Sequence, residues 1–265
     1  MKKILAILAV IIMATTTIAG CSKNTTTGID GIKERGKMIV GLDDSFPPMG
    51  FRDENNEIVG FDIDLAKEVA KRLGVEVEFK PVVWETIGIS LNNKEIDMIW
   101  NGCTITEARK KEMTFSNPYL ENKQILVVSS DSTIKGKSDL AGKVLSVQMG
   151  SSAQEALEKD TEVMNSLKEV RKFGDNVEAL LDLKAGRVDA VIVDMVVGGY
   201  YIGKHPDDYI VLEDSFQEEL YGIGMRKEDG TFIAEVNKIL AEMSEDGTAT
   251  KISEKWFGKD IFLKQ

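Results

Sequence analysis

The alternation of strand-like and helix-like segments constrains the fold of this 265-residue chain most strongly. Short apolar runs, such as residues 38–42 and 190–193, are typical of buried strands, and helix-like segments follow them. Strands that alternate with helices form mainly parallel sheets with helices on both faces. The roughly ten predicted strands are too many for one small open sheet. We therefore predict an α/β fold of two lobes joined by continuous crossovers.

Polar residues that can accept a hydrogen bond from a helix N-terminus stand at the start of several predicted helices. Asp62 begins a helix that Gly74 ends, Thr106 begins a second, and either Ser151 or Ser152 begins a third. Asp194 follows a buried strand and can begin a fourth. Ligands of α/β sheets bind where strand ends meet helix N-termini, so two facing lobes should enclose a cleft of such ends.

The N-terminus carries the pattern of a secretory signal peptide, which we assign to residues 1–20. Two lysines precede an apolar stretch at residues 4–14, which is shorter than the roughly 20 residues that span a bilayer. Residues 18–21 (Ile-Ala-Gly-Cys) resemble a bacterial lipobox, which implies cleavage before Cys21 and acylation of that cysteine, for example with palmitate. The alternative is an ordinary signal peptide with a chance cysteine.

The segment after the cysteine, residues 21–36, is rich in Ser, Thr, Lys, Asn and Gly and is predicted to be a flexible tether. We expect a lipid-anchored protein on the outer face of a cell membrane. A lipobox favours a Gram-positive surface, although periplasmic lipoproteins also carry one.

Composition excludes several classes of function. A net charge of −11 and a pI near 4.8 argue against nucleic acid as a partner, because such proteins present a basic face. With Cys21 acylated, Cys103 has no disulfide partner and should be a small buried residue. The one histidine, His205, stands in a Lys-His-Pro-Asp-Asp turn, which disfavours a Ser-His-Asp site, and no Cys/His cluster suggests a metal. We expect a binding protein without a cofactor or metal rather than an enzyme.

Two junctions offer apolar walls for a ligand. Residues 43–48 follow the first strand, and their prolines fix a turn that presents Phe46 beside Asp43. Trp84 opens a later helix, so the two rings could form an apolar slot. The alternative is that both rings belong to the core.

A third junction, residues 101–109, offers groups that suit a carboxylate. Gly102 lets a ligand approach the backbone, and Thr104 supplies a hydroxyl. Arg109 follows the cap residue Thr106 by three positions, so its guanidinium can point back over the helix start. An arginine fork matches a carboxylate with two parallel hydrogen bonds. The alternative for Arg109 is a solvated surface position.

A fourth junction and one acidic residue complete the set. Ser151 and Ser152 start a helix whose free N–H groups attract anions. Asp194 ends a strand and can accept hydrogen bonds from an ammonium group, although a plain helix cap is the alternative. A cation, free amides, an anion and aromatic walls together complement a free amino acid.

With these residues in place, the chain resembles the solute-binding proteins of polar amino acid ABC importers, over about residues 38–258. The motifs that carry the resemblance are Gly41-x-Asp43-x-x-Phe46-x-Pro48, Gly60-Phe61-Asp62-Ile63-Asp64-Leu65-Ala66, Asp97-Met98-Ile99-Trp100-Asn101-Gly102, Thr104-Ile105-Thr106-x-x-Arg109, Phe115-Ser116-Asn117-Pro118-Tyr119, Gly150-Ser151-Ser152, Gly186-Arg187-Val188-Asp189-Ala190 and Lys255-Trp256-Phe257-Gly258. Each motif is weak alone, but their order and spacing together are specific.

The resemblance implies a type II periplasmic-binding-protein fold, a clamp of two lobes with two hinge crossovers. Lobe 1 would comprise residues 37–121 and 222–265, and lobe 2 residues 122–221. The hinges would lie near residues 120–124 and 218–221. It also implies a monomer that delivers its ligand to a membrane permease.

The resemblance further assigns roles at the two ends of an amino acid ligand. Arg109 would hold the α-carboxylate, and Asp194 would accept the α-ammonium. Gly102, Thr104 and Ser152 would contact the ligand backbone.

The resemblance places Phe46 and Trp84 as walls for the ligand side chain and Asp43 where it can meet a cation. We therefore favour arginine, lysine or histidine as the ligand. Glutamine or another polar amino acid is the alternative, and a fold-related enzyme such as a dehydratase is a second one.

Overall fold

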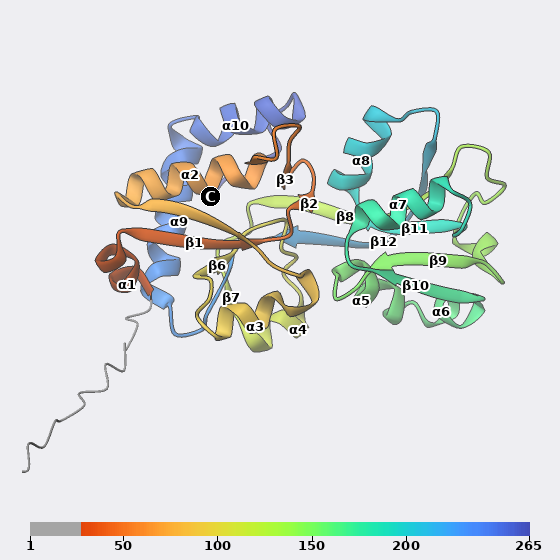
Figure 1. Cartoon of the computed structure of the whole chain (residues 1–265), viewed down its shortest axis with the longest axis horizontal. Helices are drawn as coiled ribbons and strands as arrows, with labels where there is room; N and C mark the ends of the chain where they lie inside the picture. The colour runs from red at the N-terminus through yellow and green to blue at the C-terminus, as the bar shows by residue number, and fades with distance from the viewer. Residues whose placement is uncertain (1–27) are drawn as a thin grey trace, which may run out of the picture.

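The computed structural model describes residues 28–265. The predicted signal peptide and Cys21 lie outside these residues. Figure 1 shows two α/β lobes side by side, with β8 and β12 passing between them.

Lobe 1 is built on a five-stranded sheet with the order β5-β1-β6-β13-β7. Its strands are β1 (Lys37–Leu42), β5 (Glu76–Pro81), β6 (Met98–Ile99), β7 (Thr114–Phe115) and β13 (Gly224–Met225). A small second sheet contains β2 (Ser45–Phe46), β3 (Gly50–Arg52) and β4 (Ile58–Val59). β1 runs parallel to β5 and β6, whereas β13 is antiparallel to β6 and β7.

Helices cover both faces of the lobe 1 sheet (Figure 1). They are α2 (Phe61–Leu73), η1 (Trp84–Thr86), α3 (Ile87–Asn92), α4 (Glu107–Glu112), α9 (Gly230–Glu245) and α10 (Thr248–Phe257). Successive side chains of a strand point to opposite faces, so Met38 and Val40 join the core under α2 and α9, while Ile39 packs against the cluster around α3.

Lobe 2 repeats the arrangement with the strand order β10-β9-β11-β8-β12. Its elements are β8 (Leu120–Ser129), η2 (Lys137–Leu140), β9 (Val144–Gln148), α5 (Ser152–Lys159), α6 (Thr161–Ser166), β10 (Glu169–Phe173), α7 (Asn176–Lys184), β11 (Ala190–Asp194), α8 (Met195–Lys204) and β12 (Tyr209–Tyr221). β9 is parallel to β10 and β11, and β8 is antiparallel to β11 and β12. The predicted α/β fold class with two sheets is confirmed.

The chain crosses between the two sheets on β8 and β12, which pair with each other. Their antiparallel register sets Leu120 opposite Tyr221 and Asn122 opposite Glu219. Residues that are about a hundred positions apart in sequence therefore meet between the lobes. This pairing coincides with the two segments that were predicted as hinges.

The tether prediction is wrong for its described part, because residues 28–35 form helix α1 (Gly28–Arg35). Ile32 is fully buried in the lobe 1 core, and Ile29 packs against the same cluster. Arg35 also forms an ion pair of 2.6 Å with Asp97. Two isoleucines three positions apart gave this polar segment enough of an apolar face to dock.

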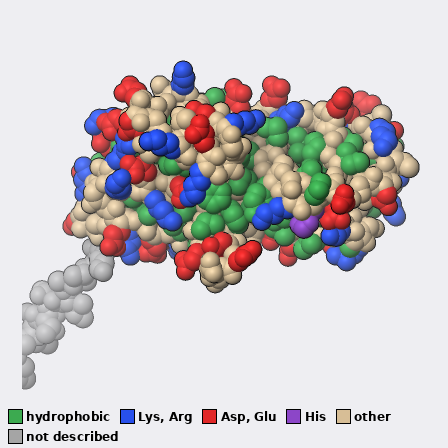
Figure 2. All heavy atoms as spheres, turned by 90° about the horizontal axis from the view of Figure 1, so that it is seen from above, with side chains coloured by type: hydrophobic (Ala, Val, Ile, Leu, Met, Phe, Trp, Pro, Cys, Tyr) green, Lys and Arg blue, Asp and Glu red, His purple; other side chains and the backbone are tan. Residues whose placement is uncertain are grey.

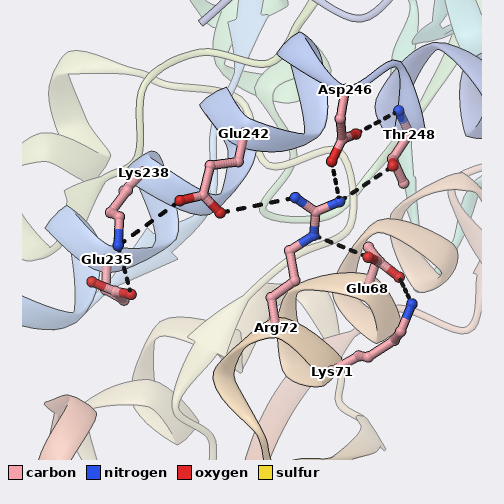
Figure 3. A network of polar contacts seen from close by, with 8 residues as sticks. All are labelled: Glu68, Lys71, Arg72, Glu235, Lys238, Glu242, Asp246 and Thr248. Atoms are coloured by element: carbon pink, nitrogen blue, oxygen red, sulfur yellow. Dashed lines mark hydrogen bonds and ion pairs between the residues drawn. The ribbon is translucent and has the colours of Figure 1, made fainter.

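Within lobe 1, a polar network joins the C-terminal helices to helix α2 (Figure 3). Arg72 of α2 donates hydrogen bonds to Glu68 at 2.9 Å, to Asp246 at 2.7 Å and to Thr248 at 3.2 Å. The network thus joins α2 to the end of α9 and to the start of α10. Such exposed pairs contribute modestly, about 0.2–1 kcal/mol each, so the buried core remains the main source of stability.

Candidate functional site

A small cavity lies between the lobes. Its lining residues are Phe46, Trp84, Asn101, Gly102, Thr104 and Arg109 from lobe 1, and Gln148, Ser151, Ser152 and Asp194 from lobe 2. The structure therefore brings eight of the nine predicted site residues together, and Asp43 is the one outside the lining. Asn101 and Gln148 line the cavity without having been predicted.

The aromatic walls come from two different elements of lobe 1. Phe46 ends β2 and Trp84 begins η1, and both rings are buried while they line the cavity. They also belong to hydrophobic clusters, so the core interpretation and the wall interpretation hold together.

The backbone conformation and the neighbouring rings require a glycine at position 102. Its φ of 60° lies in the left-handed region, and a Cβ there would stand 2.7 Å from a ring carbon of Phe46 and 3.0 Å from one of Tyr221. A side chain at this position would force both rings to move. The glycine keeps this part of the backbone accessible from the cavity.

Arg109 bridges the two lobes. Thr106 caps α4 as predicted, because its side chain accepts a hydrogen bond from the Arg109 amide at 3.2 Å. The guanidinium donates to the carbonyl of Thr104 at 3.0 Å and to that of Gly150, in lobe 2, at 3.3 Å. Its centre also lies 5.4 Å from the Trp84 ring. These contacts exclude the interpretation of Arg109 as a solvated surface residue.

Two serines form the lobe 2 side. Of the two predicted cap residues, Ser151 caps α5 by accepting a hydrogen bond from the Gln154 amide at 3.2 Å. The Ser152 hydroxyl lies 3.0 Å from that of Thr104 and accepts a hydrogen bond from Gln124 at 3.1 Å. Thr104 and Ser152 thus form a direct polar contact between the lobes.

Asp194 begins α8, but its side chain makes no cap hydrogen bond, so the cap interpretation is wrong. Its Oδ1 accepts hydrogen bonds from Tyr221 at 2.6 Å, Asn122 at 2.8 Å and Gln124 at 2.9 Å. Burial raises the pKa of Asp194 to about 7, and the neighbouring charge of Glu219 adds to the increase.

Asp43 lies behind the lining rather than in it. Its carboxylate accepts hydrogen bonds from the Ser45 amide at 2.9 Å and from the Gln148 side chain at 2.7 Å. Burial raises the pKa of Asp43 to about 6. Gln148 connects this carboxylate to the cavity and joins lobe 2 to lobe 1.

Asp62 is another correction, because α2 starts at Phe61 after Gly60 and the Asp62 side chain caps nothing. It turns inward and accepts hydrogen bonds from the Gly102 amide at 2.8 Å and from the Tyr119 hydroxyl at 2.9 Å. Burial raises the pKa of Asp62 to about 7. Asp62 therefore fixes the peptide of Gly102 from beneath the cavity.

Sequence reasoning missed the polar residues of the connecting strands. Asn122, Gln124 and Glu219 are buried, and they surround Asp194 and Ser152. Polar residues at alternate positions 122 and 124, just before the apolar run of β8, were the available signal. Their partner at position 219 required knowledge of the strand pairing.

The lobes also meet outside the cavity through aromatic rings. Phe51 of β3 lies 5.6 Å from the ring of Tyr200 on α8 and 5.9 Å from that of Trp256 on α10. Figure 2, which views the molecule from above relative to Figure 1, shows hydrophobic side chains gathered across the middle of that face.

Within residues 28–265, no group of three or more His, Cys, Asp or Glu side chains could hold a metal ion.

The comparisons with known proteins agree with this architecture. The model of the bacterial extracellular solute-binding proteins, family 3, matches residues 38–259. The L-cystine-binding protein TcyJ of Escherichia coli (strain K12) is 35% identical over 255 residues, which cover 94% of each chain. The arginine-binding extracellular protein ArtP of Bacillus subtilis (strain 168) is 31% identical over 259 residues, covering 97% of this chain and 98% of ArtP.

A solved structure is similar as well. It is an ABC uptake transporter substrate-binding protein from Streptococcus pneumoniae with bound histidine, with a TM-score of 0.86 and 35% identity. The match covers 89% of this chain and 98% of that chain.

Proposed function

This chain belongs to the bacterial extracellular solute-binding proteins, family 3, and on that premise we propose that it captures a free polar L-amino acid for an ABC importer. The named relatives are binding proteins rather than enzymes. The ligand enters between the open lobes, the lobes close on it, and the closed form delivers it to the permease.

The observation that carries this proposal is the placement of Arg109 and Asp194 on one cavity from opposite lobes. Arg109 suits the α-carboxylate, because a guanidinium binds a carboxylate through two parallel hydrogen bonds. Asp194 suits the α-ammonium. A molecule without either group would leave a buried charge unpaired, which is expensive, so the two ends together select amino acids.

Lobe closure follows from the contacts around the cavity. Three of them join the lobes, namely Thr104 to Ser152, Arg109 to Gly150 and Asp43 to Gln148. A ligand that contacts both lobes binds the closed form better than the open form and shifts the population toward it.

The charge around the cavity favours a cationic ligand: arginine, lysine or histidine. Arg109 is the one cation among the lining residues, whereas Asp194 lines the cavity and Asp43, Asp62 and Glu219 lie directly behind it. A ligand with an additional positive charge reduces this local excess of acids. Glutamine is the alternative, because Gln148 and Ser45 already engage Asp43.

A binding panel tests the proposal. The purified protein is unfolded and refolded to remove any retained ligand and is then titrated with each of the common L-amino acids while tryptophan fluorescence is recorded. We expect saturable binding of cationic amino acids and recovery of the ligand unchanged. Failure of every amino acid to bind would overturn the proposal, and exclusive binding of glutamine would overturn its cationic preference.

The lipid anchor is a separate part of the proposal. We expect Cys21 to be acylated and to hold the protein on the outer face of a membrane, most simply that of a Gram-positive cell. None of the helices within residues 28–265 has the length and hydrophobicity needed to cross a bilayer. Release of the Cys21→Ser variant into the medium, with the parent kept in the membrane fraction, would support the anchor, and equal membrane retention of both would contradict it.

A further inference from the structure

A second buried carboxylate, that of Glu219, stands behind Asp194. Glu219 lies on β12 opposite Asn122 and is only 7% exposed. Its Oε1 accepts hydrogen bonds from Thr104 at 3.0 Å, from Asn122 at 2.7 Å and from Gln124 at 2.7 Å. A residue of the connecting strands is thereby joined to the lining of the cavity.

Glu219 and Asp194 share their hydrogen-bond donors. The Asn122 side-chain nitrogen contacts both carboxylates, at 2.7 Å and 2.8 Å, and that of Gln124 contacts both at 2.7 Å and 2.9 Å. The shared nitrogens hold the two acids within a few ångströms of each other. All these donors are neutral, and no Lys or Arg in the described part of the chain forms an ion pair with either acid.

This cluster also contains more acceptors than donors. Glu219 Oε2, Asn122 Oδ1 and Gln124 Oε1 are buried and have no hydrogen-bond partner among residues 28–265. Two neighbouring carboxylates that are buried without a cation cannot both ionise cheaply. An ammonium group would bring the missing positive charge and three N–H donors.

We propose that Glu219 and Asp194 act as one acidic pair, which holds a proton when no ligand is bound and releases it when the ligand's ammonium arrives. Asp194 contacts the ammonium, and Glu219 is a positioning residue that acts through Asp194. The ammonium keeps its three protons, and the proton of the pair leaves to solvent. The inference rests on the proposed function, because it requires an amino group beside Asp194.

Other titratable groups surround the pair and must be distinguished from it. These are Tyr221 on β12, Cys103 and Arg109 in lobe 1, Asp62 and Tyr119 beyond Cys103, and Glu121, Lys123 and Glu218 on the outer side of the connecting strands. Burial raises the pKa values of Cys103, Tyr119 and Tyr221, so these groups stay neutral near pH 6. Asp62 contacts Gly102 and Tyr119 but not the pair.

Isothermal titration calorimetry in buffers of different ionisation enthalpy counts the protons released on binding. We would compare the full protein with Glu219→Gln at pH 6 and pH 8, using L-arginine and L-glutamine as probes. Glu218→Gln is the matched control, because it changes the same charge at the adjacent exposed position.

At pH 6 the parent and Glu218→Gln should release more protons per bound ligand than Glu219→Gln does, because Glu219→Gln keeps the effect of burial on Asp194 but loses the effect of the neighbouring charge. At pH 8 this difference should vanish. As the pH increases from 6 to 7, the affinity of the parent should rise about fivefold, whereas that of Glu219→Gln should rise less steeply. Any proton from Asp43 is common to all three proteins and cancels in the comparison.

Equal proton release and equal pH profiles for the parent and Glu219→Gln would overturn the inference and leave the proposed function standing. If circular dichroism shows that Glu219→Gln does not fold, the Asp43→Asn variant decides, because it cannot release a proton from position 43. Release of nearly one proton with either probe at pH 6 supports the pair, and release near zero overturns it. Absence of binding by any amino acid at either pH would instead refute the proposed function.

Discussion

Replacing Arg109 by alanine should weaken amino acid binding strongly. The variant removes the guanidinium that we assign to the ligand carboxylate and also its hydrogen bonds to Thr104 and Gly150. Each hydrogen bond to a charged group contributes about 1.5–3 kcal/mol, so two such bonds to the ligand correspond to about 3–6 kcal/mol. Because Arg109 is partly exposed, we expect the lower part of this range, about 3–4 kcal/mol or a loss of roughly 100- to 1000-fold in affinity.

Calorimetry on Arg109→Ala measures this loss directly. The matched control is Lys110→Ala in the same helix, since Lys110 is exposed and its one ion pair within residues 28–265 is with Glu107, at 2.7 Å. We expect the control to bind within twofold of the parent. An affinity for Arg109→Ala within threefold of the parent would refute the assignment of Arg109 to the ligand carboxylate.

Two further substitutions test the walls of the cavity and the contact outside it. Gly102→Ala would place a Cβ 2.7 Å from the Phe46 ring and 3.0 Å from the Tyr221 ring. Ligand affinity, measured by tryptophan fluorescence, should therefore fall at least tenfold. Unchanged affinity would show that the two rings can move aside at little cost. Tyr200→Ala removes a ring 5.6 Å from Phe51 and should destabilise the closed form by about 0.5–1.5 kcal/mol. Ligand affinity should then fall about twofold to tenfold, and X-ray scattering should report a more extended ligand-free protein, whereas Tyr200→Phe should match the parent. Equal affinity and equal scattering for both variants would contradict a role of this ring in lobe closure.

The sequence allowed prediction of the fold and of most of the cavity because the relevant signals are local. Thr106 and Ser151 cap the helices that they precede, and such caps depend on only the next three residues. The strand–helix alternation likewise specified two sheets. Gly102 shortly follows strand β6 and Arg109 lies in the first turn of α4, so both could be placed near the cavity from local signals.

Features that depend on pairing between distant segments could not be predicted. Asp62 has the position of a helix cap, yet its carboxylate turns inward because the Gly102 amide and the Tyr119 hydroxyl, about 40 and 57 positions further on, offer buried donors. Glu219 meets Asn122 only because β8 and β12 pair in one particular register. A local reading of the sequence contains neither of these contacts.

Because helix α1 is docked on lobe 1, the segment between the proposed lipid anchor at Cys21 and the folded protein is short. Since residues 28–35 are docked on lobe 1, only seven peptide links remain between Cys21 and the folded body, instead of the whole predicted tether. At about 3.5 Å per residue, a fully extended segment of this length reaches roughly 25 Å. Lobe 1 would then stay within about one domain diameter of the lipid headgroups, and capture and hand-over would occur at the membrane surface rather than at a distance from it.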